Sequence, residues 1–205
     1  MKKEELKIGT GRIEAFSDAV IAIIMTLMIL EIHLPEIEDT ATASEIWHQL
    51  SGMLPNLFAY MLSFAVLGSF WVNHHQFLHA IAHSDRNLLW YNLHFLFWLS
   101  IVPLPTAFLA EHFQKPQASM LYGISMLTAG GSFVVMNAYA EKKELFIEKL
   151  SSKVRSRIIK LNILSISLYI ISIFICYLSV YISIIIFAFV PALYFIPQNV
   201  ELEKD

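Results

Sequence analysis

"GRIEAFSDAVIAIIMTLMILEI" (residues 11–32) contains an apolar run from Ala19 to Leu30 whose one polar residue is Thr26. Four polar or charged residues stand just before this run: Arg12, Glu14, Ser17 and Asp18. With its flanks, the stretch approaches the ~20 residues that a transmembrane helix needs. It therefore predicts a membrane helix with a polar cluster at one end.

The composition extends this prediction to the whole chain. Of 205 residues, 57% are hydrophobic and 15% are charged, whereas a soluble domain is roughly half apolar and about 25% charged. The apolar residues gather in long blocks, most of them close to the length of a membrane span. The chain is thus predicted to be an all-α integral membrane protein.

Six spans account for these blocks, and together they form one transmembrane domain over residues 1–205. No Gly or Pro marks a turn in the last block, residues 158–196, and we place the turn near residues 178–181. A five-span alternative remains open for this block. The predicted helices, numbered 1 to 6 in chain order, are about 12–34, 54–80, 86–110, 117–140, 158–177 and 181–197.

Basic residues orient the spans, because cytoplasmic loops carry an excess of Lys and Arg. With six spans and a cytoplasmic N-terminus, every Lys and Arg except Lys115 lies on the cytoplasmic side. The first outer loop, about 35–52, has no Lys or Arg and carries Glu36, Glu38, Asp39 and Glu45. Both termini are therefore predicted to be cytoplasmic.

Little chain is left for a separate catalytic domain. The longest cytoplasmic piece, residues 141–157, is expected to be a short charged helix or linker. The sequence contains no Walker loop, no G-x-G-x-x-G and no T-V-G-Y-G filter of the kind that replaces the water around potassium with carbonyl oxygens. We expect no enzyme activity, no cofactor and no nucleic-acid partner.

Polar residues within spans are costly and tend to face partners or water. Helix 2 carries Trp71, Asn73 and several histidines, and helix 3 carries Asn92 at a similar predicted depth to Asp18. One interpretation is a buried polar network that holds helices 1, 2 and 3 in register. The alternative is a proton or metal site.

Three histidines of helix 2, His75, His79 and His83, repeat at intervals of four and share a face. Two of them would suffice to chelate a divalent metal. Because helix 2 contains no Asp or Glu beside them, we predict no metal site. They remain the basis of an alternative function, a proton- or metal-coupled secondary transporter.

Helix 1 also carries an aliphatic stripe, Ile23, Leu27 and Leu30, with Thr26 beside it. Its spacing of i, i+4, i+7 places these side chains on one face of a helix. From the residues alone, lipid contact or helix packing is the favoured explanation of this stripe, because every face of the helix is apolar and periodicity does not single out one of them.

Several motifs resemble those of the transmembrane protein 175 family, the endolysosomal potassium channels and their bacterial relatives. Arg12-x-x-x-Phe16-Ser17-Asp18 opens the first span, and Trp71-Val72-Asn73-His74 lies late in the second. Further similar positions are Asp85, Asn92 and Pro103. The resemblance covers helices 1 to 3, whereas helices 4 to 6 agree only in hydropathy and number. A single six-helix repeat is typical of a bacterial member.

This resemblance implies a potassium-preferring cation channel without a carbonyl filter, in the bacterial inner membrane. It implies a homotetramer in the lipid bilayer, with helix 1 lining a central pore for potassium and other monovalent cations. The implied constriction, which would gate and select by dehydration, consists of Ile23, Leu27 and Leu30, with Thr26 as a hydroxyl layer. The implied polar network that holds the pore helix consists of Arg12, Phe16, Ser17, Asp18, Trp71, His74 and Asn92.

Overall fold

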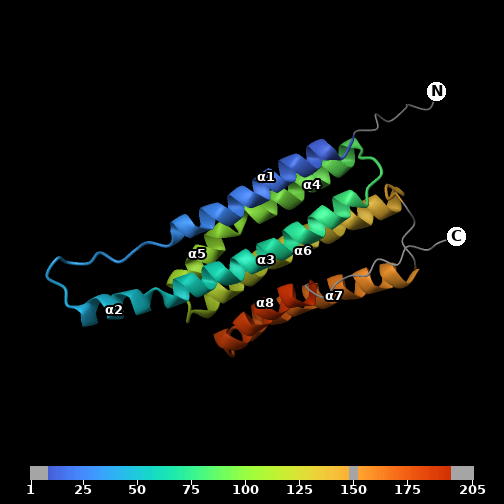
Figure 1. Ribbon diagram of the computed structural model, residues 1–205. Helices are drawn as coiled ribbons and strands as arrows, with labels where there is room; N and C mark the ends of the chain where they lie inside the picture. Colours follow the sequence, from blue (N-terminus) through green and yellow to red (C-terminus); the bar gives the residue numbers. More distant parts are fainter. Residues whose placement is uncertain (1–8, 148–151, 195–205) are drawn as a thin grey trace, which may run out of the picture.

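The protein is a bundle of long apolar helices, as the sequence predicts (Figure 1). The computed structural model describes residues 9–147 and 152–194. Five helical segments in this part are long and apolar enough to cross a membrane, and α8 is a shorter apolar helix. The elements are α1 (Gly11–Leu27), η1 (Met28–Glu31), α2 (Ala43–Gly52), α3 (Leu54–His79), α4 (Arg86–Ile101), α5 (Pro103–Glu111), α6 (Pro116–Lys142), α7 (Ser152–Ile175) and α8 (Val180–Tyr194).

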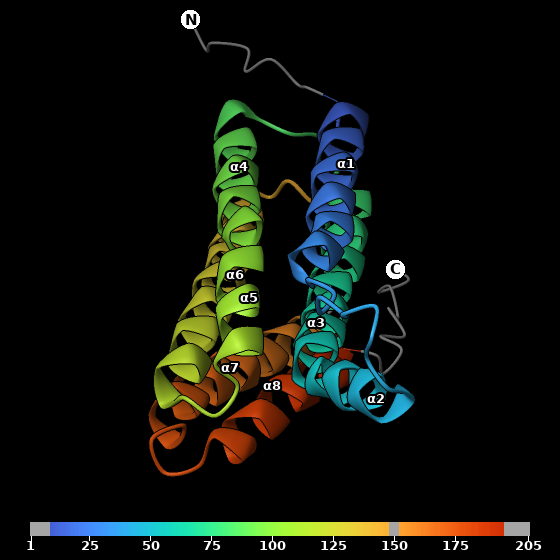
Figure 2. The same cartoon turned by 90° about the vertical axis from the view of Figure 1, so that its left-hand side faces the viewer.

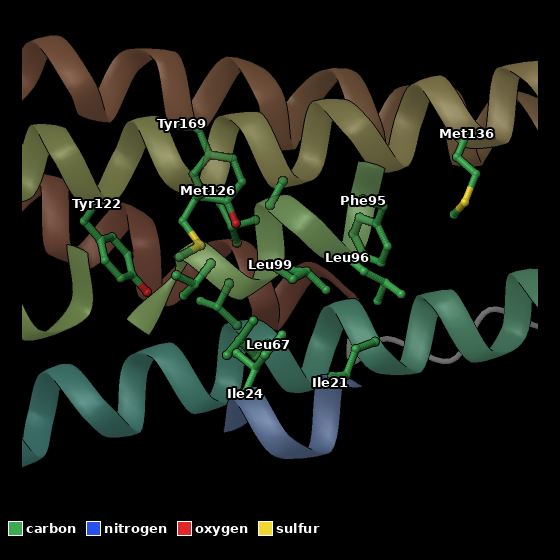
Figure 3. Packing of buried hydrophobic residues seen from close by; sticks show 14 of the residues in the cluster. Ile21, Ile24, Leu67, Phe95, Leu96, Leu99, Tyr122, Met126, Met136 and Tyr169 are labelled. Atoms are coloured by element: carbon green, nitrogen blue, oxygen red, sulfur yellow. The ribbon is translucent and has the colours of Figure 1, made fainter. Parts of the chain in front are cut away.

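The helices pack in a ring around one apolar core. α1 packs against α4 and α3, α4 against α6, α6 against α7, α7 against α8, and α8 against α3. In Figure 2, α1 and α3 lie on one side of the molecule and α4 and α6 on the other. Figure 3 shows buried side chains from α1, α3, α4, α6 and α7 meeting between them, among them Ile21, Leu67, Leu99, Met126 and Tyr169.

The first span is shorter than the predicted 12–34. The α-helix ends at Leu27, one 3₁₀ turn follows to Glu31, and Ile32 is extended with φ −87° and ψ 104°. A proline disfavours helical backbone in the residue before it, so Pro35 already opposes helix at Leu34. The predicted C-terminal boundary of helix 1 was therefore too late by three residues.

The segment before α3 holds a helix that we did not predict. α2 (Ala43–Gly52) lies at one end of the bundle, and the chain leading to it extends away from the other helices (Figure 1). Thr42 and Glu45 form a capping box, in which Glu45 Oε2 accepts from the Thr42 amide at 2.7 Å. The T-x-x-E spacing that signals such a cap was readable in the sequence.

The predicted third span, 86–110, is broken in two. α4 ends at Ile101 and α5 begins at Pro103. Pro103 and Pro105 have no N–H group and so cannot continue the helical hydrogen-bond pattern. Beyond the break, the Thr106 hydroxyl donates to the Val102 carbonyl at 2.8 Å and is bonded to Ser63 Oγ at 2.9 Å. This buried polar contact fastens the broken segment to α3.

The last apolar block forms two helices rather than one, although α8, with 15 described residues, is shorter than the five candidate membrane spans. α7 ends at Ile175 and α8 begins at Val180. The turn between them is stabilised by the Leu178 amide, which donates to the Ile175 carbonyl at 2.9 Å. It thus begins slightly before the predicted 178–181. Residues 195–197 of the predicted sixth helix lie outside the described residues.

The segment 141–157, expected to be a short charged helix or linker, is shared between neighbouring helices, because α6 runs to Lys142 and α7 begins at Ser152. α6 continues to Lys142, and a turn follows in which Glu144 has a positive φ of 54°. Next to it, the Ala82 amide donates to the Leu145 carbonyl at 2.8 Å, which ties this turn to the chain after α3. Residues 148–151 lie outside the described residues.

Gly123 allows α6 to approach α7 and α8 closely. A Cβ atom at this position would lie 2.8 Å from Ile173 Cγ1 and 3.2 Å from Phe187 Cζ. Ile173 is β-branched and stiff at χ1, and Phe187 is fully buried. We therefore expect Gly123→Ala to destabilise the fold by about 1–3 kcal/mol through overpacking, measured as a lower midpoint of thermal unfolding in detergent.

Gly131→Ala, also in α6, is the matched control. A Cβ atom there would meet nothing within 4 Å, and alanine favours the helix over glycine by ~0.5–1 kcal/mol. Its midpoint should be unchanged or higher. Equal midpoints for the two variants would contradict the close packing at Gly123.

Candidate functional site: the first helix and its polar network

The first helix has one covered face and one open face. Ile13, Ser17, Ile21 and Ile24 are buried against the bundle. Because every face of this helix is apolar in sequence, hydropathy gave no contrast between the two. The neighbours α3 and α4 therefore decide which face is covered.

A chain of three buried side chains links α1, α4 and α3. Asn92 Nδ2 donates to Ser17 Oγ at 2.9 Å, and Asn92 Oδ1 lies 2.7 Å from His74 Nε2. With its amide nitrogen committed to Ser17, Asn92 presents its oxygen to His74, so His74 Nε2 is the donor. All three residues are buried. The structure thus brings Ser17, His74 and Asn92 together, as the predicted network requires.

The His74 ring is also held by packing. It stacks on Phe95 with ring centroids 5.4 Å apart and an interplanar angle of 17°. Its Nδ1 atom is buried and has no hydrogen-bond partner among the described residues. The bond to Asn92 is therefore the polar contact that orients this imidazole.

A second contact joins α1 and α3 beside this chain. Trp71 Nε1 donates to Asp18 Oδ1 at 2.9 Å. Asp18 is partly buried, and Trp71 is 40% exposed within one chain. The pairing explains how an acid is accommodated at the start of an apolar helix, since the indole N–H satisfies one of its oxygens.

Glu14, one helical turn before Asp18, makes a further polar contact between α1 and α3. Its Oε1 lies 3.3 Å from His75 Nδ1 and 3.2 Å from His79 Nε2. Glu14 was not among our predicted site residues, and the sequence shows no acid beside these histidines within their own helix. A signal existed: Glu14 and Asp18 are four residues apart on one face of α1, as are Trp71, His75 and His79 on α3.

Two predicted members of the network lie elsewhere. Arg12 is exposed, with no ion pair or hydrogen bond to any residue that the structure describes, and Phe16 is 51% exposed. Both lie on the open face of α1, because residues 12, 16, 19, 23 and 30 recur at helical spacing. Among the described residues, then, Arg12 makes no polar contact with the network, and Phe16 lies on the opposite, open face.

Asp85, which the sequence singled out only by resemblance, has a structural role. It caps α4 by accepting from the Leu88 amide at 2.7 Å, and its other oxygen accepts from the Tyr139 hydroxyl at 2.5 Å. A cap of this kind contributes ~0.5–2 kcal/mol to a helix. Asp85 thus joins the start of α4 to the end of α6, outside the network around α1.

The open face of α1 carries the predicted aliphatic stripe. Ile23 is 55% exposed, Leu27 51% and Leu30 69%. Thr26 is also exposed, and its hydroxyl donates to the Ala22 carbonyl at 2.8 Å. Its proton is thereby used within the helix, while oxygen lone pairs remain free to accept.

The fold and this site define an all-helical, multi-pass membrane protein whose first helix is anchored on one side by polar contacts. Residues 12–103 match the family described as the endosomal/lysosomal potassium channel TMEM175. A potassium channel of Chryseobacterium sp. (strain P1-3) is 34% identical over 95% of this chain and 96% of its own length. This chain belongs to the TMEM175 family, which confirms the resemblance drawn from its motifs.

Two further proteins are similar to this chain, one over most of its length and one over about half of it. The crystal structure of a lysosomal potassium-selective channel TMEM175 homolog from Chamaesiphon minutus matches with a TM-score of 0.76 and 29% identity, covering 90% of this chain and 95% of that one. A protein of Gallus gallus named endosomal/lysosomal proton channel TMEM175 is 33% identical over 109 residues, which are 51% of this chain and 22% of that protein. The similarity to the animal protein is therefore confined to part of each chain.

Proposed function

We propose that this chain is the subunit of a potassium-preferring cation channel, a homotetramer whose central pore is lined by α1. The observation that carries the proposal is the open face of α1, where Ile23, Leu27 and Leu30 are each more than half exposed. The names of the relatives, potassium channel and potassium-selective channel, agree with it. Four copies of this face around one axis would place these side chains in successive rings.

Selection in such a pore would depend on dehydration. A ring of Ile23 side chains offers no oxygen to an ion, and a narrow apolar constriction closes by losing its water. Potassium is the larger ion and holds its water less tightly than sodium does. It would therefore pass an aliphatic ring at lower cost, with a preference weaker than that of a carbonyl filter.

Thr26 would supply oxygen next to the aliphatic rings. Its hydroxyl proton is donated to the Ala22 carbonyl, so what it presents outward is acceptor capacity. A cation that has lost part of its water would find partial replacement there. This assigns Thr26 to ion passage and the neighbouring aliphatic side chains to the barrier.

Arg12 and Phe16 lie on the same open face of α1 as Ile23 and Leu30. In the proposed tetramer they would therefore face the central axis near the N-terminal end of α1. The polar contacts within one chain would hold α1 against α3 and α4 from behind. In this arrangement the pore helix is supported on its bundle side and free to face the axis.

Planar bilayers containing the purified protein test this function, with potassium chloride on one side and sodium chloride on the other. We expect a conductance whose reversal potential favours potassium, because sodium pays more to shed water at the aliphatic rings. Protein-free bilayers are the control. A tetramer that carries no current but drives ion uptake against an imposed gradient would instead identify a coupled transporter.

A further inference from the structure

Glu14, His75 and His79 form a compact group between α1 and α3. Their ligating atoms all lie within 4.8 Å of one another. The two histidines are four residues apart on α3, so they project from one face of that helix. The acid comes from a different helix, which is why the sequence alone did not place it there.

The distances suit a bound ion as well as an ion pair. With zinc–ligand bonds of about 2.0–2.1 Å, two ligands of a tetrahedral ion lie about 3.3–3.4 Å apart. Glu14 Oε1 is 3.3 Å from His75 Nδ1 and 3.2 Å from His79 Nε2. Two edges of a tetrahedron are thus already present, and the two histidine nitrogens lie within 4.8 Å of each other.

The His75 nitrogen is the second observation that indicates a ligand. His75 Nδ1 is buried and makes no hydrogen bond of acceptable geometry to any described residue, despite its distance to Glu14. A buried polar atom without a partner is costly. The ring is also held in place, because it stacks on Trp71 with centroids 5.8 Å apart and an angle of 28°.

We infer that Glu14, His75 and His79 form a binding site for a divalent transition-metal ion, with zinc the best match to two imidazoles and one carboxylate. Three protein ligands leave the fourth position for water. The His79 side chain is 62% exposed, so the ion has access from solvent. A bound ion would clamp the first helix to α3 one turn from the Asp18–Trp71 contact.

Equilibrium dialysis of the whole protein against micromolar free zinc tests the site. The affinity tag must lack histidine, and the protein is first stripped with a chelator. We expect one zinc per chain for the native sequence, measured by mass spectrometry of the metal. Because even an outer-shell partner is worth about 10–100-fold in metal affinity, Glu14→Gln and His79→Asn should each weaken binding at least tenfold.

His83→Asn is the matched control, since His83 shares the spacing of His75 and His79 in sequence but is absent from the group. It should bind zinc as the native chain does. Zinc should also raise the unfolding temperature of the native protein and the His83 variant, because a ligand that binds the folded state stabilises it. This second readout should be lost in His79→Asn. Absence of zinc binding, or equal binding by the His79 and His83 variants, would overturn the inference.

Discussion

Ile23→Asn is expected to erode the preference for potassium over sodium. An amide in each subunit would hydrate the ring of Ile23 side chains in the proposed pore, so that both ions would pass with more of their water. Each tenfold loss of the permeability ratio moves the bi-ionic reversal potential by about 59 mV. We expect a shift of that order toward the non-selective value, measured in planar bilayers together with a larger conductance.

Ile29→Asn provides the control for this substitution. Ile29 is 42% exposed, but it lies roughly 120° around the 3₁₀ turn from Leu30, away from the stripe of Ile23, Leu27 and Leu30. The same amide there should leave the reversal potential unchanged. If both variants shift it equally, or if the Ile23 variant conducts with native selectivity, the constriction lies elsewhere.

Asn92→Ala is expected to lower stability more than any exposed substitution in α4. It removes the acceptor for His74 Nε2 and the donor to Ser17 Oγ, both inside the bundle. An orphaned buried polar group costs about 1–3 kcal/mol. Ser17 has a helical carbonyl as a substitute partner, whereas the His74 Nδ1 atom already has none among the described residues. Most of the loss should therefore come from His74.

Thermal unfolding in detergent measures this effect, with Asn87→Ala as the matched control. Asn87 is exposed on the same helix, so its replacement should leave the midpoint nearly unchanged. The double variant His74→Leu/Asn92→Leu tests whether the unsatisfied His74 nitrogen causes the loss of stability. It removes both hydrogen-bonding partners, and replacing both by apolar groups is often nearly neutral. It should recover part of the lost stability. A midpoint equal to that of Asn87→Ala would contradict a structural role for Asn92.

Asn92→Ala and Ile23→Asn are expected to have different effects because they act on opposite faces of α1. Asn92 acts on the covered face, where Ser17 meets α4 and α3. Ile23 lies on the open face, where it contacts little of its own chain. The first substitution should therefore change folding, and the second should change what passes the assembled protein.

Much of this architecture was predictable because its signals are local. The thickness of a bilayer sets the length of each apolar run, which identifies the spans without any knowledge of their neighbours. Pro103 is another local signal, because it lies at the break between α4 and α5. We nevertheless predicted one continuous helix there. The Thr42–Glu45 capping box is a further local signal, although we predicted a loop at the position of α2.

The class of protein, the approximate positions of its long apolar helices and the residue types that form its polar network are readable from the sequence. Tertiary structure decided which of those residues meet. Ser17, His74 and Asn92 come together, Arg12 and Phe16 stay on the open face, and Glu14 joins two histidines of another helix. The physical reason is that hydropathy reports only the solvent each segment prefers. In a helix that is apolar on every side, the covered face depends on the packing of helices distant in sequence.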